Sequence, residues 1–211
     1  MCERLKFETG AYDQGFQCIV GLDEAGRGPM AGPLVVAGVV FPKDFYDDRI
    51  NDSKQLSEKK RESLYDLVIE HCIAYSIQII EVEEVDELNV YQASRIGMIR
   101  AIEDIIANGV KIDYALTDAM PLGDVIAHEA IVKGDAKSMS IGGASILAKV
   151  TRDRLMLEYD KVYPKYGFKK HKGYPTKMHK DALKEFGVSP IHRRSFKPVM
   201  DVLNEQLSLD I

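Results

Sequence analysis

The chain has 211 residues, the length of a single domain with at most a small appendage. Hydrophobic residues make up 45% of it and charged residues 29%, as in an ordinary globular protein, and the net charge is −5. Three cysteines without CxxC spacing argue against structural zinc and a disulfide framework, and no apolar run could span a membrane, so we expect a reduced, cytoplasmic protein.

Hydrophobic periodicity separates the expected strands from the expected helices. In chain order, we expect strands at residues 17–24, 33–41, 73–82, 112–118 and 126–133, and helices at residues 57–72, 89–108 and 140–160. Ser57 can cap the first helix, and Gly109 can end the second. Residues 161–175 are basic, aromatic and irregular, and we expect two short helices after them.

The order of these elements indicates the fold class. A glycine-rich turn joins the first two strands into a hairpin, and helices and strands alternate after it. This order implies an α/β fold whose mixed sheet begins with an antiparallel hairpin.

Charge is distributed unevenly along the chain. Between Lys133 and Pro198 there are 16 lysine and arginine residues against 6 acidic residues, although the whole chain is acidic. A basic C-terminal third indicates a surface that binds a polyanion such as a nucleic acid. The alternative is an ordinary solvated basic surface.

Two adjacent acids end the first expected strand. Residues 21–28 read Gly-Leu-Asp-Glu-Ala-Gly-Arg-Gly, so Asp23 and Glu24 follow an apolar run. Carboxylate oxygens without thiols or imidazoles suit Mg²⁺ or Mn²⁺. Gly26 and Gly28 allow a bulky group to approach the backbone. The alternative is an exposed acidic turn after an edge strand.

Asp118 and Asp135 follow the fourth and fifth expected strands. Acids at the carboxyl ends of strands converge where α/β sheets usually place their sites, and several such carboxylates can hold two metal ions for phosphoryl transfer. Because successive strand residues face opposite ways, Asp23 and Glu24 can share a metal only if the strand ends or bulges there. Taken alone, Asp118 or Asp135 is more simply a turn or cap acid.

Six segments together resemble bacterial ribonuclease HII, a type 2 ribonuclease H, over nearly the whole chain. They are residues 21–33, 51–57, 133–137, 144–153, 171–176 and 192–198. The resemblance implies an RNase H-like mixed sheet flanked by helices, with a catalytic core at 1–160 and a small basic C-terminal helical element at 161–211 of the same compact domain. It also implies hydrolysis of RNA in RNA/DNA hybrids and at single ribonucleotides in duplex DNA, leaving 5′-phosphate and 3′-hydroxyl ends.

The resemblance assigns roles to particular residues. The acids that match the family's metal ligands and catalytic residues are Asp23, Glu24, Asp118 and Asp135, which would hold Mg²⁺ or Mn²⁺, two ions when substrate is bound. The backbone of Gly26, Arg27 and Gly28 matches the segment that holds the ribose 2′-hydroxyl, and Tyr174 matches a tyrosine packed on the next sugar. For Tyr174 the alternative is core packing.

Further basic residues are candidates for binding phosphate, which positions a duplex without reading its sequence. These candidates are Lys54, Lys172, Arg193 and Arg194. We expect His171, His179 and His192 to be phosphate contacts or surface residues rather than metal ligands. Two departures from the family pattern concern the turns after site residues: Ala119 follows Asp118 where glycine is usual, and Pro175 follows Tyr174.

The C-terminal residues Gln206–Ile211 resemble the short peptide with which bacterial repair proteins dock on the sliding clamp. The alternative is a packed helix end, because Val199, Leu203 and Leu207 fall at helical spacing. We expect a monomer with no membrane partner. Two rival functions are another two-metal nuclease or recombinase of the same fold, and a non-catalytic nucleic-acid-binding module. Clustered acids argue against the module, because without metal they repel phosphates.

Overall fold

The structure is a computed structural model that describes residues 3–50 and 57–209, with side chains described as far as residue 205. It divides into two compact units. The first unit comprises Met1–Ala25, Val35–Ile79 and Ser94–Val150, and the second comprises Gly26–Leu34, Ile80–Ala93 and Thr151–Ile211. The boundary at residue 160 between a core and a C-terminal element stays a prediction.

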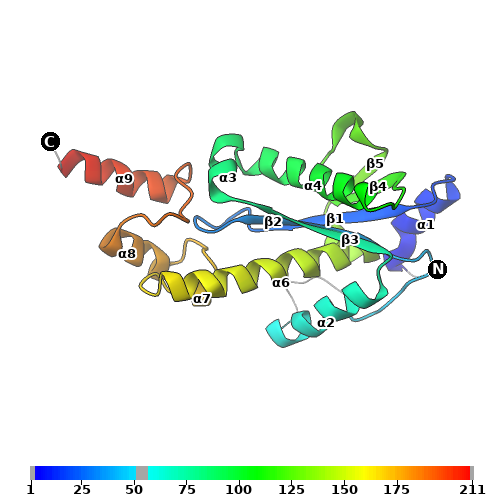
Figure 1. Cartoon of the computed structure of the whole chain (residues 1–211), viewed down its shortest axis with the longest axis horizontal. Helices are drawn as coiled ribbons and strands as arrows, with labels where there is room; N and C mark the ends of the chain where they lie inside the picture. The colour runs from blue at the N-terminus through cyan, green and yellow to red at the C-terminus, as the bar shows by residue number, and fades with distance from the viewer. Residues whose placement is uncertain (1–2, 51–56, 210–211) are drawn as a thin grey trace. The chain divides into compact units, whose positions relative to one another are not determined.

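The helices and strands follow one another in the order shown in Figure 1. They are η1 (Glu3–Leu5), α1 (Lys6–Asp13), β1 (Ile19–Ala25), β2 (Leu34–Val40), α2 (Glu58–His71), β3 (Ala74–Ile80), α3 (Val82–Leu88), α4 (Val90–Ala107), β4 (Tyr114–Asp118), η3 (Gly123–Val125), β5 (His128–Ile131), α5 (Gly134–Lys137), α6 (Met139–Val162), α7 (Phe168–His171), α8 (Lys177–Phe186) and α9 (Lys197–Leu209).

The five strands form one mixed sheet in the order β3-β2-β1-β4-β5. Strands β1 and β2 are antiparallel, whereas β1, β4 and β5 run parallel. All seven residues of β2 are buried because helices cover both faces of the sheet. A Cβ on Gly38 would lie 3.4 Å from Ile105 of α4, and one on Gly21 would overlap the start of α6. The expected α/β fold with a flanked mixed sheet is confirmed (Figure 1).

Helices α1 and α3 are additions to the elements expected from sequence, as are the short helices α5 and α7, the latter within the stretch expected to be irregular. Helix α1 precedes the first strand, and α3 follows β3 directly, where the alternating pattern had extended the strand to residue 82. Glu81 has extended backbone and begins α3, and Asn89, with φ of 64°, ends it. This positive φ, with ψ of 158°, breaks the helical backbone at Asn89, so α3 stays a separate short helix between the strand and α4.

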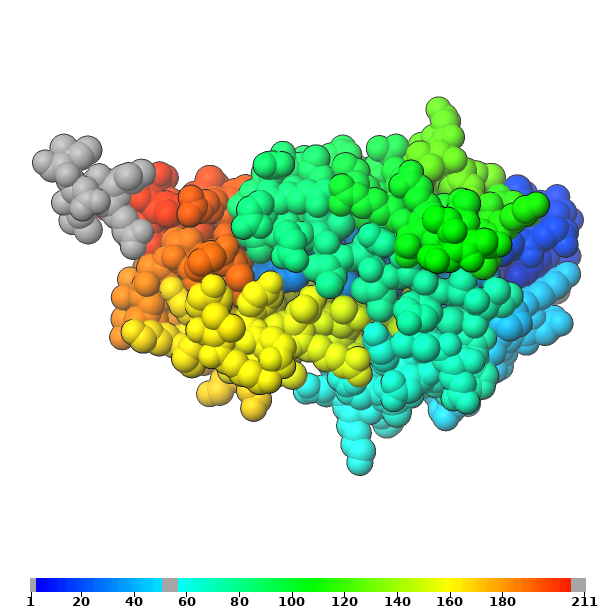
Figure 2. Space-filling model, in the orientation of Figure 1, coloured from blue at the N-terminus to red at the C-terminus, as the bar shows by residue number. Residues whose placement is uncertain are grey.

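The second unit has its own apolar clusters. Phe168, Met156 and Ile191 are buried in one of them. In the other, Leu183 of α8 packs with Val199 and Val202 of α9. Helices α8 and α9 therefore share an apolar contact, and their residues adjoin at the surface in Figure 2.

Candidate active site

Strand topology brings Asp23, Asp118 and Asp135 together in the first unit. Strands β1 and β4 are parallel and Leu22 pairs with Thr117, so the next residues, Asp23 and Asp118, lie on neighbouring strands at the same edge of the sheet. Asp135 belongs to α5, which follows β5. One carboxylate oxygen from each acid lies within 4.8 Å of the others, and no other such group of acids, histidines or cysteines exists among the described residues.

Hydrogen bonds orient each carboxylate of this candidate metal centre. The N–H groups of Glu24, Gly134 and Ala136 donate to Asp23, Asp118 and Asp135 over 2.7, 2.8 and 3.0 Å, respectively. The Ser145 side chain of α6 also hydrogen-bonds Asp23.

The electrostatics of the cluster favour a cation. Asp23 and Asp135 are 3% and 4% exposed. Burial, together with the nearby charges of Glu24 and Asp118, raises the pKa of Asp23 well above its ordinary value. A divalent cation would relieve this repulsion, and a set of carboxylate oxygens without sulfur or nitrogen fits Mg²⁺ or Mn²⁺. The three acids therefore fit the metal that the sequence implies.

Glu24 does not join the group of three. Strand β1 continues to Ala25, and Asp23 and Glu24 pair in regular register with Ala37 and Val36 of β2. Strand β1 therefore neither ends nor bulges at these two residues, which was the condition for both acids to share one metal. Glu24 still lies close enough to raise the pKa of Asp23, and its role as a ligand stays a prediction.

The turn after Asp118 explains why glycine is usual there. Ala119 has φ of 53°, a left-handed conformation that costs an alanine about 1–2 kcal/mol and a glycine almost nothing. The Ala119 N–H donates to the carbonyl of Ile131 over 3.1 Å, and the Thr117 hydroxyl donates to the carbonyl of Met120 over 2.6 Å. The turn keeps its hydrogen bonds in spite of the alanine.

In the second unit, a buried arginine holds the glycine turn that the sequence singled out. Gly26 has φ of 108°, and a Cβ there would lie 2.3 Å from Nε of Arg152. The Arg152 guanidinium donates to the carbonyls of Pro33 and Ala31 over 3.0 and 3.1 Å, and to that of Lys172 over 2.8 Å. Arg152 thus joins the turn to the loop before Tyr174. Sequence reasoning missed it, because Arg152 stands among Thr151, Asp153 and Arg154 and nothing in this polar stretch indicates a buried side chain.

Arg193 is a correction to the expected phosphate contacts. Its side chain is fully buried, and its Nε donates to the carbonyl of Gly32 over 2.9 Å. Burial, together with the charge of Arg152, lowers the pKa of Arg193 to about 9. A fully buried guanidinium cannot contact the phosphates of a duplex that binds at the protein surface. Arg193 instead supports the glycine turn.

Tyr174 lies beside the glycine turn within the same unit. It is 44% exposed, so the alternative of core packing was wrong. A Cβ on Gly28 would lie 3.4 Å from Cε1 of Tyr174, which places the ring next to Gly28. The N–H of Thr176 donates back to the Tyr174 carbonyl over 2.8 Å, a tight turn centred on Pro175 that needs no N–H at position 175. Pro175 is therefore compatible with the loop.

The three histidines form a buried network, which contradicts the expectation of phosphate contacts or surface residues. His179 Nδ1 donates to the Tyr174 carbonyl over 3.0 Å, so its Nε2 accepts from His192 over 3.0 Å. His171 Nδ1 accepts from the N–H of Gly173 over 3.2 Å. Burial lowers the pKa of His179 to about 3 and that of His192 to about 4, so both stay neutral. The network fixes the backbone that carries Tyr174.

The remaining candidate basic residues differ in their surroundings. Arg27 and Arg194 are exposed, and the backbone N–H of Arg194 donates to Asp86 over 2.7 Å. Lys172 is half-buried, and its Nζ donates to the carbonyl of Lys169 over 2.8 Å. Lys54 lies outside the described residues.

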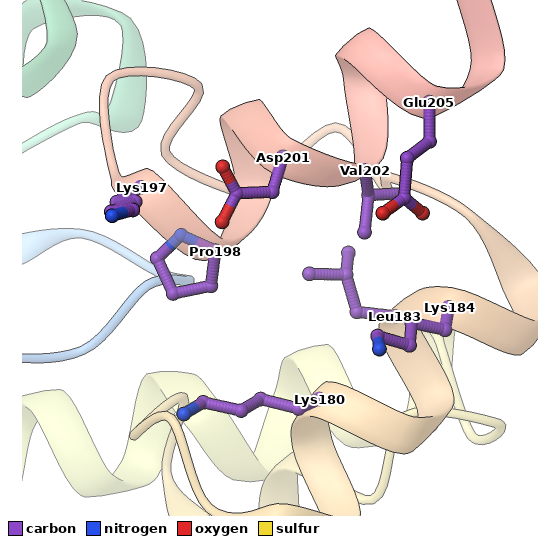
Figure 3. A pocket seen from close by; sticks show the side chains of 8 residues that line it. All are labelled: Lys180, Leu183, Lys184, Lys197, Pro198, Asp201, Val202 and Glu205. Atoms are coloured by element: carbon purple, nitrogen blue, oxygen red, sulfur yellow. The ribbon is translucent and has the colours of Figure 1, made fainter.

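The C-terminal helix includes most of the segment Gln206–Ile211 that the sequence suggests as a docking peptide. Helix α9 runs to Leu209, so the backbone from Gln206 to Leu209 is helical, and the side chains after residue 205 lie outside the described part. Leu183 of α8 and Val202 of α9 line a groove together, as Figure 3 shows; α8 also contributes Lys180 and Lys184, and α9 contributes Lys197, Pro198, Asp201 and Glu205. The helical spacing expected for Val199 and Leu203 is confirmed, since both pack in this part of the second unit.

The comparison with protein families decides the relationship. The sequence model described as "Ribonuclease HII" matches residues 20–199. The chain belongs to the ribonuclease HII family. It is 50% identical to a ribonuclease HII of Acholeplasma laidlawii over 204 residues, covering 96% of this chain and 98% of that protein. It is also 50% identical to a ribonuclease HII of Bacillus pumilus over 202 residues, covering 96% and 78% of the two chains.

Solved structures agree with this membership. The ribonuclease H2 of Pyrococcus horikoshii is 26% identical with a TM-score of 0.77, covering 90% of this chain and 98% of that one. A structure of the PCNA:RNase HII complex from Archaeoglobus fulgidus is 25% identical with a TM-score of 0.73, covering 87% and 96%. The chain is therefore an RNase H endonuclease that acts on RNA/DNA substrates with a divalent metal. No helix in the described part of this ribonuclease HII family member is long and apolar enough to span a membrane.

Proposed function

We propose that the chain cleaves RNA in RNA/DNA hybrids and at single ribonucleotides embedded in duplex DNA, leaving 5′-phosphate and 3′-hydroxyl ends. The observation that carries the proposal is the convergence of Asp23, Asp118 and Asp135 in a member of the ribonuclease HII family. We assign these acids and Glu24 as catalytic metal ligands.

The protein's own residues prepare the reaction before substrate arrives. The N–H groups of Glu24, Gly134 and Ala136 hold the three carboxylates in fixed orientations. The free-energy cost of orienting them therefore does not add to the activation barrier. Two bound divalent ions would activate water and stabilise the leaving oxygen. Titration with Mn²⁺, with and without hybrid substrate, measures how many ions the protein binds. One bound ion in both states would contradict the two-ion assignment.

Ribose recognition is assigned to the glycine turn and Tyr174. The 2′-hydroxyl, which distinguishes RNA from DNA, can both donate and accept a hydrogen bond, and the backbone groups of the exposed residues Arg27 and Gly28 are the proposed partners. The Tyr174 ring beside Gly28 offers a flat apolar surface for the adjacent sugar. Exposed Arg194 and half-buried Lys172 are assigned to phosphates, as is Lys54 from the sequence.

A cleavage assay tests the proposal and separates it from its rivals. The protein is incubated with Mg²⁺ and a duplex DNA containing one ribonucleotide, beside an RNA/DNA hybrid and an all-DNA duplex. We expect cleavage of the first two only, and loss of activity in Asp23→Asn and Asp118→Asn. Glu129→Gln, on exposed β5, is the matched control and should remain active. Cleavage of all-DNA duplex would favour another two-metal nuclease, and binding without cleavage would favour the non-catalytic module.

A second proposal concerns a partner. We propose that Gln206–Ile211 docks on the sliding clamp, because a structural relative was solved as a PCNA:RNase HII complex. Docking requires the end of α9 to leave its helical conformation after Glu205, the last of the residues that line the groove in Figure 3. A peptide of residues 201–211 should bind clamp, and Gln206→Ala should abolish binding while Asn204→Ala should not. A deletion of 206–211 that lowers the melting temperature without affecting clamp binding would support the packed-helix alternative.

A further inference from the structure

The N-terminal segment Glu3–Asp13, formed by η1 and α1, has no part in the candidate site described above. It also precedes residues 20–199, which the family's sequence model matches. Within the first unit, two of its charged side chains nevertheless contact the short stretch that carries Asp135 and begins α6. In Figure 1, α1 lies near this end of α6.

Glu8 holds the junction between α5 and α6. It is 4% exposed, and its Oε1 accepts hydrogen bonds from the Ser138 hydroxyl over 2.6 Å and the Ser140 N–H over 3.0 Å. The Ser138 oxygen in turn accepts from the Ile141 N–H over 3.2 Å. A carboxylate at a helix N-terminus is favourable because it meets unpaired N–H groups and the positive end of the helix dipole. Glu8 thus fixes the start of α6 through charge-assisted hydrogen bonds.

The Arg4 side chain contacts the backbone of Asp135, one of the three acids of the candidate metal centre. Its Nη2 donates to the carbonyl of Asp135 over 3.0 Å. A Cβ on Gly142 would lie 2.9 Å from the same nitrogen, so the guanidinium fits closely against α6 where glycine leaves room. Asp135 is therefore held at its own carbonyl by Arg4 and, three residues later, at Ser138 by Glu8.

Apolar packing holds α1 against the sheet, so the segment that carries Arg4 and Glu8 has a fixed position. Ala11 is buried in one cluster with Ile19 of β1, Leu116 of β4 and Ile131 of β5. Strand β1 carries Asp23 two residues before its end, and β4 ends at Asp118. One small cluster therefore links α1 to the strands that position the other two acids.

We propose that Glu8, assisted by Arg4, is a positioning residue of the metal centre: it sets the position of Asp135 relative to Asp23 and Asp118. A buried carboxylate is costly unless strong hydrogen bonds compensate for its lost hydration, and packing alone would be served by an apolar residue. The inference rests on the proposed role of Asp135 as a metal ligand.

Manganese affinity tests the inference without relying on activity. Free Mn²⁺ is measured by electron paramagnetic resonance in the full-length protein, well below its melting temperature. We expect Glu8→Ala to weaken Mn²⁺ binding about tenfold, the lower end for residues that orient metal ligands. Glu8→Gln should weaken it less, because the amide oxygen still accepts hydrogen bonds. Glu3→Ala, which removes an equal charge from an exposed position of the same segment, should change nothing.

The outcomes separate positioning from a merely structural role. A structural role would lower the melting temperature of Glu8→Ala but leave Mn²⁺ affinity within twofold of the wild type, and this result would overturn the inference. KM for the hybrid should stay unchanged in either case. The double variant Glu8→Ala/Ser138→Ala should bind Mn²⁺ no more weakly than Glu8→Ala, because Glu8→Ala already removes the hydrogen bond between Glu8 and Ser138. Additive losses would contradict the inference. Wild-type affinity in Asp135→Asn would reject the metal site itself, and the inference with it.

Discussion

Replacing Asp23 with asparagine should stabilise the metal-free protein while abolishing its activity. Asp23 is 3% exposed, and burial together with the charges of Glu24 and Asp118 raises its pKa well above 3.8. Two ionised carboxylates 4.8 Å apart, the upper limit for the ligand atoms of Asp23 and Asp118, repel by about 3.5 kcal/mol at an effective dielectric constant of 20. Removing one charge removes this repulsion.

The size of the gain at pH 7 has an upper limit. Asp23 can take up a proton instead of bearing the repulsion, which limits the penalty to about 1.4 kcal/mol per pH unit above its ordinary pKa, or about 4 kcal/mol at pH 7. Asparagine keeps only part of the hydrogen bonding to the Glu24 N–H and Ser145. We therefore expect a net gain of about 2 kcal/mol in the free energy of unfolding, or about 4–8 °C in melting temperature for a chain of this length.

The pH dependence follows from the direction of the shift. A carboxyl whose pKa is raised by folding binds its proton more tightly in the native state, so the wild type loses stability as the pH rises from about 4 towards the native pKa. The asparagine variant does not titrate at this position. The difference in melting temperature should therefore be small at pH 4 and largest near neutrality.

Thermal melts in EDTA at several pH values provide the measurement, with Glu129→Gln as the control. Mg²⁺ should then stabilise the wild type more than Asp23→Asn and so narrow the difference. A variant that melts below the wild type at pH 7, or an equal difference at pH 4 and pH 7, would refute the reasoning, because the repulsion would not be the dominant effect.

Further predictions concern the turn at Ala119, the exposed Tyr174, and the two adjacent arginines Arg193 and Arg194. Ala119→Gly should leave the melting temperature unchanged or raise it by up to about 4 °C, because it relieves the left-handed alanine; a fall would show that the turn is unstrained. Tyr174→Ala should reduce cleavage at a single ribonucleotide at least tenfold with unchanged Mn²⁺ affinity, whereas equally exposed Tyr75→Ala should have no effect, and equal losses would reject the assigned contact. Arg193→Met should lower the free energy of unfolding by about 1–3 kcal/mol, because it leaves a buried carbonyl unpaired. Arg194→Gln should instead reduce by about one unit the slope of the logarithm of the hybrid-binding constant against the logarithm of salt concentration. The reverse pattern would contradict the burial of Arg193.

Local patterns were sufficient for the strands and for most of the metal site. Strand periodicity placed Asp23 and Asp118 at strand ends, and any parallel pairing of those strands brings such residues to one edge. Six segments together, residues 21–33 and 133–137 among them, also identified the family that the comparisons confirm. These features are readable from sequence because they depend on neighbouring residues and on period-two alternation.

Long-range packing determines which polar side chains are buried, and the local sequence pattern did not predict this. Arg193 and Arg194 are adjacent and chemically identical, yet one is buried under the glycine turn and the other is exposed. The histidines looked like surface residues but form a buried network, and Glu8 meets Ser138 from 130 positions away in the chain. Burial and hydrogen-bond partners are properties of the folded surroundings, because the free energy of a charge depends on which distant groups replace its water. The sequence by itself determined which residues could do the chemistry, and only the tertiary structure decided which of them are exposed and which are buried and hydrogen-bonded to their surroundings.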